Sequence, residues 1–378
     1  MKISEIDNNS KLAQTNKNAS AENSIKESQN TKTKDQCING YKYDIDTSKK
    51  GFELSYHQNE PQSRKAKCTK TFIISMLPFA FQPAFKKAFT KAFPQYAGND
   101  KGSAILTGNI NSDNVFYKQI EKLTTTDQLP DILITSDFNS LYHTNFKVNL
   151  LNTANFETLN FPLHPIYAKA DFAHPSNLMG MLASDVLVMV VDKSKFEDKA
   201  FPYEWYELLN PTLRNSIVFC GDIDFSCNTV YYPFVKNFGF DAIKQLVNNT
   251  LAYIHPADML HLIHSGNRIS ASVYVMPYSY ARSIQNKFDY QIIWPNDGAI
   301  PIPIQMLVKK GAYEKHEDII NFLKGKTLGE EFEKNGFLAT NPNASKQCPD
   351  SNLNWVGWNF IENSNMRILK KKIGEYFK

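Results

Sequence analysis

The sequence lacks several features that would assign it quickly to a functional class. No apolar stretch of its 378 residues reaches the roughly 18 residues of a membrane-spanning helix, since the longest candidates, 183–191 and 72–85, are interrupted by polar residues or proline. An excess of one charge is also absent, because 42 basic and 38 acidic residues leave a formal charge of only +4. Nucleic-acid-binding proteins usually carry a strong positive field. We therefore expect a soluble protein without a nucleic-acid partner.

Cysteine is scarce, and its spacing fits neither a disulfide framework nor a zinc site. Cys220 and Cys227 could pair in an exported protein, but two reduced thiols beside a strand-to-helix turn are the simpler interpretation. His261 and His264 share a helical face, yet the glutamate of a zinc protease is missing between them. We expect no metal site and no resident cofactor. The five cysteines are Cys37, Cys68, Cys220, Cys227 and Cys348.

Apolar clusters are rare at the amino terminus. Residues 1–69 are rich in Lys, Asn, Ser, Gln, Thr and Glu, and such a stretch cannot bury enough apolar surface to offset the entropy of ordering. We predict a polar, disordered leader. A secretory signal needs a basic start and an apolar run of about 7–15 residues, which residues 1–30 lack. The sequence therefore shows no signal peptide, and a cytoplasmic location stays open.

From residue 71 onward, short apolar runs of strand length alternate with stretches at helical spacing. This alternation predicts a parallel sheet, and ligands of such sheets bind beyond the carboxyl ends of the strands. The loops after Ser75 and after Ser136 are therefore candidate ligand edges. The pattern predicts strands over 71–77, 103–107 and 131–135, and helices over 84–93 and 113–123.

A second body begins with a nearly continuous apolar run over 185–192. Such a run is typical of a strand buried on both faces, and we predict that it crosses between two lobes. Later patterns predict strands over 216–220, 268–276, 290–294 and 305–309, and helices over 229–238, 317–325 and 328–336. The predicted divisions are a leader over 1–69, lobe 1 over 70–184, lobe 2 over 185–281, and a return to lobe 1 with carboxyl-terminal helices over 282–378.

Three stretches resemble motifs of one known family. Residues 202–218 are similar to a P-x-x-W-x-x-L-L-x-P-x-x-x-x-x-I pattern, residues 293–299 to an x-W-P-x-D-G-A strand and loop, and residues 324–337 to a closing helix and turn. These are motifs of extracellular solute-binding proteins of the iron, thiamine and polyamine type. The ending 355–360 also resembles a subgroup found in anaerobic bacteria. The resemblance runs from about residue 71 to the end of the chain.

The resemblance implies an α/β protein with a type II periplasmic-binding-protein-like fold, in which each of two lobes is a mainly parallel sheet flanked by helices. A hinge would close the lobes on a small molecule or ion, and an ABC permease would recognise the closed form. It implies a monomer outside the cytoplasm, without catalytic residues. The cleft residues that follow from it are Ser75, Met76, Leu77, Ser136 and Asp137 in the first lobe, Cys227, Asn228, Thr229, Tyr278, Ser279 and Tyr280 in the second, and Asp297 near the return crossing.

The identity of the ligand is open. Relatives that bind ferric iron use two adjacent tyrosines, whereas here Ser279 separates Tyr278 from Tyr280. Both phenols face the cleft if this segment is extended, and they diverge if it is helical. Tyr231 and Tyr232 are adjacent, but they begin a predicted helix, where a ring is expected in the core. We favour an organic or anionic ligand held by hydroxyls and helix amino termini, with ferric iron and polyamines as alternatives.

Two other functional classes fit parts of the sequence. The missing signal and the polar leader suit a cytosolic ligand-binding or sensory protein of the same fold. The fold also hosts enzymes, and Cys227 at a helix amino terminus could be an activated thiolate. No Ser-His-Asp or Cys-His arrangement supports an enzyme. Ser136 and Asp137 also have a structural explanation, because such residues commonly end a strand and cap the next segment.

Overall fold

The computed structural model describes residues 71–97, 104–109, 120–136, 140–196, 200–221, 229–265, 271–344 and 351–377, together with the backbone of three short strands nearer the amino terminus. These strands are β1 (Cys37–Ile38), β2 (Tyr41–Ile45) and β3 (Leu54–His57), which pair as an antiparallel sheet. They lie within the predicted leader, whose disorder stays a prediction. No helix in the described ranges is long and apolar enough to span a bilayer.

Lobe 1 is built on a sheet with the order β5-β4-β6-β12-β7. The alternation of side chains along the strands divides its core into two halves. Ile73 and Leu77 pack with helices α1, α8 and α9 on one face, whereas Ile74 and Met76 belong to the core on the other face. The strands are β4 (Ile73–Leu77), β5 (Ala104–Asn109), β6 (Ile132–Ser136), β7 (Gly180–Asp192) and β12 (Ile300–Val308), and the helices are α1 (Gln82–Ala92), α3 (Pro165–Lys169), α8 (Glu317–Leu323) and α9 (Lys326–Lys334).

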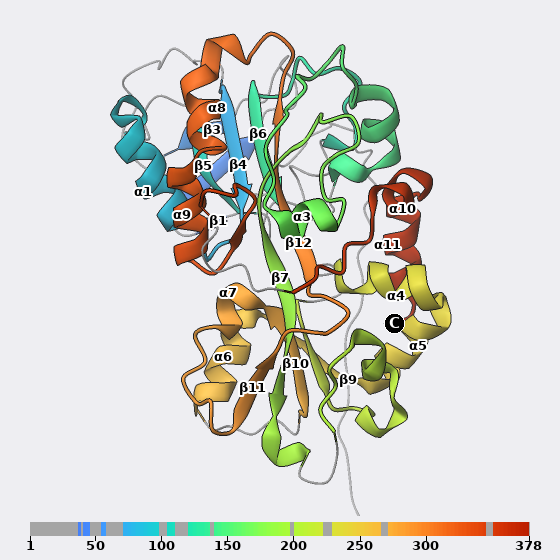
Figure 1. Cartoon of the computed structure of the whole chain (residues 1–378). Coiled ribbons are helices and arrows are strands. Elements are labelled where there is room, and N and C mark those ends of the chain that lie inside the picture. Colours follow the sequence, from blue (N-terminus) through green and yellow to red (C-terminus); the bar gives the residue numbers. More distant parts are fainter. Residues whose placement is uncertain are drawn as a thin grey trace, which may run out of the picture.

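Lobe 2 continues the same sheet beyond β7 in the order β10-β8-β9, and β11 also pairs with β7. Helices α6 and α7 lie on one side of this sheet and α4 and α5 on the other (Figure 1). The strands are β8 (Ile217–Cys220), β9 (Thr250–Ile254), β10 (Val273–Pro277) and β11 (Tyr290–Ile293), and the helices are α4 (Tyr231–Phe238), α5 (Phe240–Asn249), α6 (Pro256–Ser265) and α7 (Tyr278–Ala281).

Strand β7 joins the lobes, as its apolar sequence predicts. All 13 of its residues are buried. Residues 180–187 pair with β12, and residues 187–191 pair with β10. The strand begins at Gly180 rather than at 185, because residues 180–184 also pair with β12 and, in part, with the short strand β13 (Leu338–Ala339). The domain boundaries predicted around this crossing stay a prediction.

The second crossing strand, β12, corrects the prediction of a strand confined to 305–309. It begins at Ile300 and includes Pro301 and Pro303. Proline lacks the N–H that a central strand needs and is tolerated at strand edges. Strand β6 ends at Ser136, opposite Ile304, so the prolines have β7 as their paired strand. The missing N–H groups therefore leave the ladder with β6 intact.

Most other predicted elements agree with the structure in type and place. The helix predicted over 113–123 lies largely outside the described residues, and so does the start of the strand predicted over 268–276.

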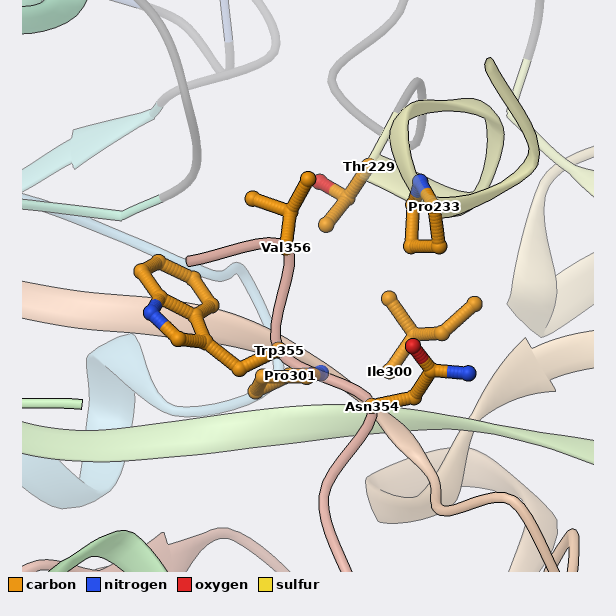
Figure 2. Close-up of a pocket in the computed structure, with 7 residues that line it drawn as sticks. All are labelled: Thr229, Pro233, Ile300, Pro301, Asn354, Trp355 and Val356. Carbon is orange, nitrogen blue, oxygen red and sulfur yellow. The ribbon is translucent and has the colours of Figure 1, made fainter. Parts of the chain in front are cut away.

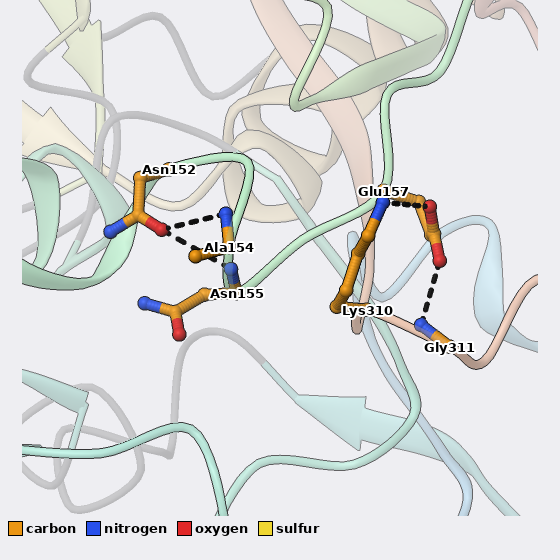
Figure 3. A network of polar contacts seen from close by, with 6 residues as sticks. All are labelled: Asn152, Ala154, Asn155, Glu157, Lys310 and Gly311. Atoms are coloured by element: carbon orange, nitrogen blue, oxygen red, sulfur yellow. Dashed lines mark hydrogen bonds and ion pairs between the residues drawn. The ribbon is translucent and has the colours of Figure 1, made fainter.

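A polar network holds the far end of lobe 1: the carboxylate of Glu157 accepts hydrogen bonds from Lys310 Nζ at 3.0 Å and from the Gly311 N–H at 2.7 Å (Figure 3). This network ties the turn after β12 to the segment before α3, away from the junction of the lobes.

The carboxyl-terminal helices α10 (Trp358–Asn363) and α11 (Met366–Glu375) touch both lobes. On lobe 1, Lys147 Nζ donates to three carbonyl oxygens at the end of α10, at 2.8–3.1 Å. On lobe 2, the ring of Phe377 packs 5.2 Å from Tyr231 and 5.3 Å from Tyr253. The end of the chain therefore forms a third connection between the lobes.

Candidate functional site

The strand directions identify where a ligand would bind. Strands β4, β5 and β6 are parallel, and β7 runs the same way because both β6 and β7 are antiparallel to β12. These strands therefore run toward lobe 2. Strands β8, β9 and β10 run the opposite way, toward lobe 1. The carboxyl ends of both sets consequently face each other across the crossing strands (Figure 1), and ligands of open α/β sheets bind at such ends.

Several helices begin at these same ends. Helix α1 follows β4, α6 follows β9, and α7 follows β10. Helix α4 begins soon after β8 and is preceded by a helical turn at Thr229 and Val230. The first N–H groups of a helix lack intrahelical acceptors and carry a partial positive charge. Helices α1, α4 and α6 thus direct their amino termini toward the space between the lobes, whereas the Ser279 N–H of α7 already donates to Asp185.

A shallow recess lies at this junction (Figure 2). It is enclosed by the start of α4, the start of β12 and the segment that leads into α10. Thr229, a predicted cleft residue, lies beside it, and so does Asn354, which the sequence analysis missed. The lining residues are Thr229, Pro233, Ile300, Pro301, Asn354, Trp355 and Val356.

In lobe 1, the predicted residues Ser75, Met76 and Leu77 are all buried within β4. Direct contact of these side chains with a ligand stays a prediction. Phe79, just beyond the strand, is 53% exposed. An exposed aromatic ring at a strand end is a candidate ligand contact, and the only sequence signal for it was its place after Pro78. Asp137 lies outside the described residues.

Ser136, at the carboxyl end of β6, has a buried hydroxyl oxygen without a hydrogen-bond partner in the described part of the chain. An unpaired buried hydroxyl contributes little to stability. We expect Ser136→Ala to change the free energy of unfolding by less than about 1 kcal/mol and to weaken solute binding if a bound solute supplies the missing partner. Urea unfolding and calorimetric titration of the same samples check this. Unchanged affinity would remove Ser136 from the site.

In lobe 2, Tyr278, Ser279 and Tyr280 lie on helix α7 and are half-buried. The extended conformation that would point both phenols the same way is therefore wrong. The Tyr278 ring meets Trp294 edge to face at 6.0 Å, whereas the Tyr280 ring meets His255 at 6.2 Å. Helical geometry separates the two phenols because residues two apart on a helix diverge. Cys227 and Asn228 lie outside the described residues.

Asp185 is a buried acid that the sequence analysis did not select. Its carboxylate accepts the Ser279 N–H at 3.2 Å and the Ser279 hydroxyl at 2.5 Å. Burial raises the pKa of Asp185 to about 6, although hydrogen bonds from Ser279 and Val186 oppose this shift. The available signal was an aspartate inside an otherwise apolar strand.

Asp297 has a structural partner. Its carboxylate accepts the backbone N–H of Trp205 at 3.2 Å, and the Trp205 indole N–H donates to the Gly298 carbonyl at 2.8 Å. The Asn296 N–H also donates to the Tyr203 carbonyl at 2.7 Å. Two of the stretches that carry the family resemblance, 202–218 and 293–299, are therefore bound to each other. Contact of Asp297 with a ligand stays a prediction.

Comparison with known proteins agrees with this architecture. A family model described as "Bacterial extracellular solute-binding protein" matches residues 127–364, more than half of the chain. No curated protein matches the sequence. Within the described residues, no group of three or more His, Cys, Asp and Glu side chains is arranged to hold a metal ion.

Solved structures share the fold at low sequence identity. The periplasmic binding protein AfuA from Actinobacillus pleuropneumoniae, with fructose-6-phosphate bound, is 17% identical over 81% of this chain and 97% of its own, with a TM-score of 0.55. The apo ferric ion-binding protein A of Pasteurella haemolytica is 12% identical over 82% and 99%, with a TM-score of 0.57. A putative spermidine/putrescine ABC transporter protein from Listeria monocytogenes is 15% identical over 81% and 99%, with a TM-score of 0.52. The predicted two-lobed fold is confirmed.

Proposed function

The chain belongs to the bacterial extracellular solute-binding proteins, the binding components of ABC importers, and from this premise we propose that it captures one small solute between its lobes and delivers it to a membrane permease. The observation that carries this proposal is that the carboxyl ends of both sets of parallel strands face one another across two crossing strands. A solute that contacts both lobes stabilises their closed arrangement. Capture and release require no covalent chemistry.

We propose an organic, anionic solute. Helices α1, α4 and α6 begin at the junction of the lobes, and helix amino termini attract anions. Thr229 and Asn354 lie at the same junction. Ferric iron bound by a tyrosine pair is less well supported, because Tyr278 and Tyr280 diverge and the adjacent Tyr231 and Tyr232 are buried. The similar structures are named for a sugar phosphate, ferric ion and polyamines. The comparison with them therefore does not identify the class of solute.

The proposal includes a location and an assembly state. A protein of an extracellular family that serves a permease acts outside the cytoplasm, and we place this one there as a monomer that docks on the membrane complex. It has no proposed catalytic role. A cytosolic sensor of the same fold would bind its solute in the same cleft, so cell fractionation followed by immunoblotting separates the two locations.

A thermal-shift screen of the full chain tests the solute. We would use inorganic phosphate, hexose phosphates, citrate, ferric citrate, ferric ion, spermidine and putrescine. A solute present at 100 times its dissociation constant stabilises the folded protein by about 2.7 kcal/mol. We expect a hit among the organic anions. A hit with ferric ion alone would contradict the proposed solute class, and no hit at all would count against a solute-binding role.

A further inference from the structure

Helix α7 is too short to hold its own position. It has four residues, Tyr278–Ala281, and it follows β10 directly at the junction of the lobes. A single helical turn is unstable in isolation because its nucleation cost is not repaid by further hydrogen bonds. Its direction must therefore be set by neighbouring residues. This direction decides where the rings of Tyr278 and Tyr280 lie relative to a solute.

Asp185 supplies the contact at the start of α7. It lies on the crossing strand β7, opposite Ile302 of the second crossing strand. Asp185 is only 4% exposed. Its carboxylate accepts hydrogen bonds from both the N–H and the hydroxyl of Ser279, which is 94 residues away in sequence. The Val186 N–H donates to the same carboxylate at 2.8 Å.

This arrangement changes the role of Ser279. A hydroxyl at the start of a cleft helix is a natural ligand contact, and the sequence analysis selected it as one. In the structure, the Ser279 hydroxyl donates a hydrogen bond to the Asp185 carboxylate at 2.5 Å. A buried carboxylate is costly unless hydrogen bonds compensate for lost hydration. The hydrogen bonds from Ser279 therefore stabilise the Asp185 carboxylate and hold Ser279 in place.

We propose that Asp185 is a positioning residue of the solute cleft, and that Asp185 and Ser279 act as one unit that sets the direction of α7 and hence of Tyr278 and Tyr280. This inference rests on the proposed function, since it names the residues that shape the same cleft. In this role Asp185 holds α7 from the crossing strand, and the Ser279 hydroxyl binds Asp185 instead of the solute.

The unit responds to acid in a distinctive way. Burial raises the pKa of Asp185 from 3.8 to about 6. Because the folded pKa is the higher one, the contribution of Asp185 to folding stability is complete below about pH 3.8 and is lost as the pH rises through about 6. Protonation near pH 6 also removes the charge that attracts the Ser279 donors. Acidification therefore has two effects. It stabilises the folded state as a whole, because it removes a buried charge, and it weakens the local contact with α7, because a neutral carboxyl attracts the Ser279 donors less.

Other charged or titratable groups lie on the elements packed against α7. Helix α6 carries Asp258, His261 and His264, with His255 just before it, and β10 carries Tyr274. Tyr278 lies on α7 and Arg282 directly after it, and Glu333 and Lys334 lie at the end of α9, which also packs against β7. Strands β12 and β13 contribute no charged or titratable side chain. The pH response of α7 is compared with that of Asp185→Asn, in which these other groups are unchanged.

Hydrogen exchange of the α7 amides in the ligand-free full chain tests the unit directly. We expect Asp185→Asn to raise the exchange rate of these amides roughly tenfold, as for the loss of a charge-assisted hydrogen bond. Ser279→Ala should raise it as well, and the double variant should exchange like Asp185→Asn alone, because the two changes remove one interaction. In wild type the rate should rise as the pH falls through about 6, beyond the intrinsic pH effect measured in Asp185→Asn.

The chain offers a matched control. Asp192 lies on the same strand, is also 4% exposed, and accepts the Ser194 N–H and hydroxyl at 3.0 and 2.7 Å. Asp192→Asn removes an equivalent carboxylate away from α7 and should leave the exchange of α7 unchanged. Unchanged α7 exchange in Asp185→Asn, or additive effects of the two variants, would overturn the proposal.

Binding then connects the unit to the cleft. Inorganic phosphate, citrate and fructose 6-phosphate are titrated into wild type and into each variant. For any of these that wild type binds, Asp185→Asn should weaken affinity about tenfold, the scale on which supporting side chains affect the groups they orient. Loss of affinity in Ser279→Ala with none in Asp185→Asn would make Ser279 a direct solute contact and refute the unit. If wild type binds none of the three, the proposed solute class fails, and the exchange data still decide the role of Asp185 at α7.

Discussion

Replacing Trp205 with alanine is expected to lower the free energy of unfolding by about 3–5 kcal/mol, the usual cost of truncating a buried tryptophan. Trp205 is only 2% exposed, and it joins two distant parts of the chain. Its backbone N–H donates to Asp297 and its indole N–H to Gly298, 92 and 93 residues away. The variant therefore loses packing and leaves the Gly298 carbonyl without this donor, so both contributions act in the same direction.

Tyr206 is the control for this experiment. It is the next residue on the same short helix, η6 (Trp205–Leu209), and it is 50% exposed. Truncating an exposed side chain usually changes stability by less than about 0.5 kcal/mol, so Tyr206→Ala should unfold like wild type. Urea unfolding followed by circular dichroism avoids the loss of tryptophan fluorescence. Equal midpoints for Trp205→Ala and wild type would show that the docking of the two family stretches contributes no stability.

Replacing Gly336 with alanine is expected to disturb the contact between the lobes and to weaken solute binding. Gly336 follows α9 in lobe 1 with φ at +86°. A Cβ there would lie 2.9 Å from the Ser279 Cα and 2.5 Å from the Arg282 Cδ, both in lobe 2. Arg282 also donates to the Glu333 and Lys334 carbonyls at the end of α9, at 3.1 and 3.2 Å. The added methyl group therefore pushes α7 away from α9 at the place where the lobes meet.

Gly311 separates this steric effect from backbone strain. It also has a positive φ, +76°, but a Cβ there would meet nothing within 4 Å. Gly311→Ala should cost about 1–2 kcal/mol from the left-handed conformation alone. Gly336→Ala should cost a further 1–3 kcal/mol, roughly, from overpacking, with a changed radius of gyration by small-angle scattering. If both variants lose the same stability and both keep the wild-type scattering profile, the contact between Gly336 and α7 does not control the arrangement of the lobes.

Local patterns in the sequence were sufficient to predict much of the fold. The apolar run 185–192 predicted a crossing strand because a strand buried on both faces needs apolar residues at every position. The second crossing strand was predicted too short, because Pro301 and Pro303 are normally signs of a break. Only the pairing of β12 with β6 and β7 explains why they are tolerated: β6 ends opposite Ile304.

In the candidate site, too, some features follow from the sequence and others only from the tertiary structure. The sequence by itself determined the alternation of strands and helices, the two lobes, and the strand ends that bring Ser136, Thr229 and Tyr278 toward one junction, because periodicity and strand order depend on neighbouring residues. Only the tertiary structure decided that Ser279 bonds to Asp185 and that the phenols of Tyr278 and Tyr280 diverge. The partner and burial of a polar side chain depend on residues far away in the chain, and they are settled when the lobes pack.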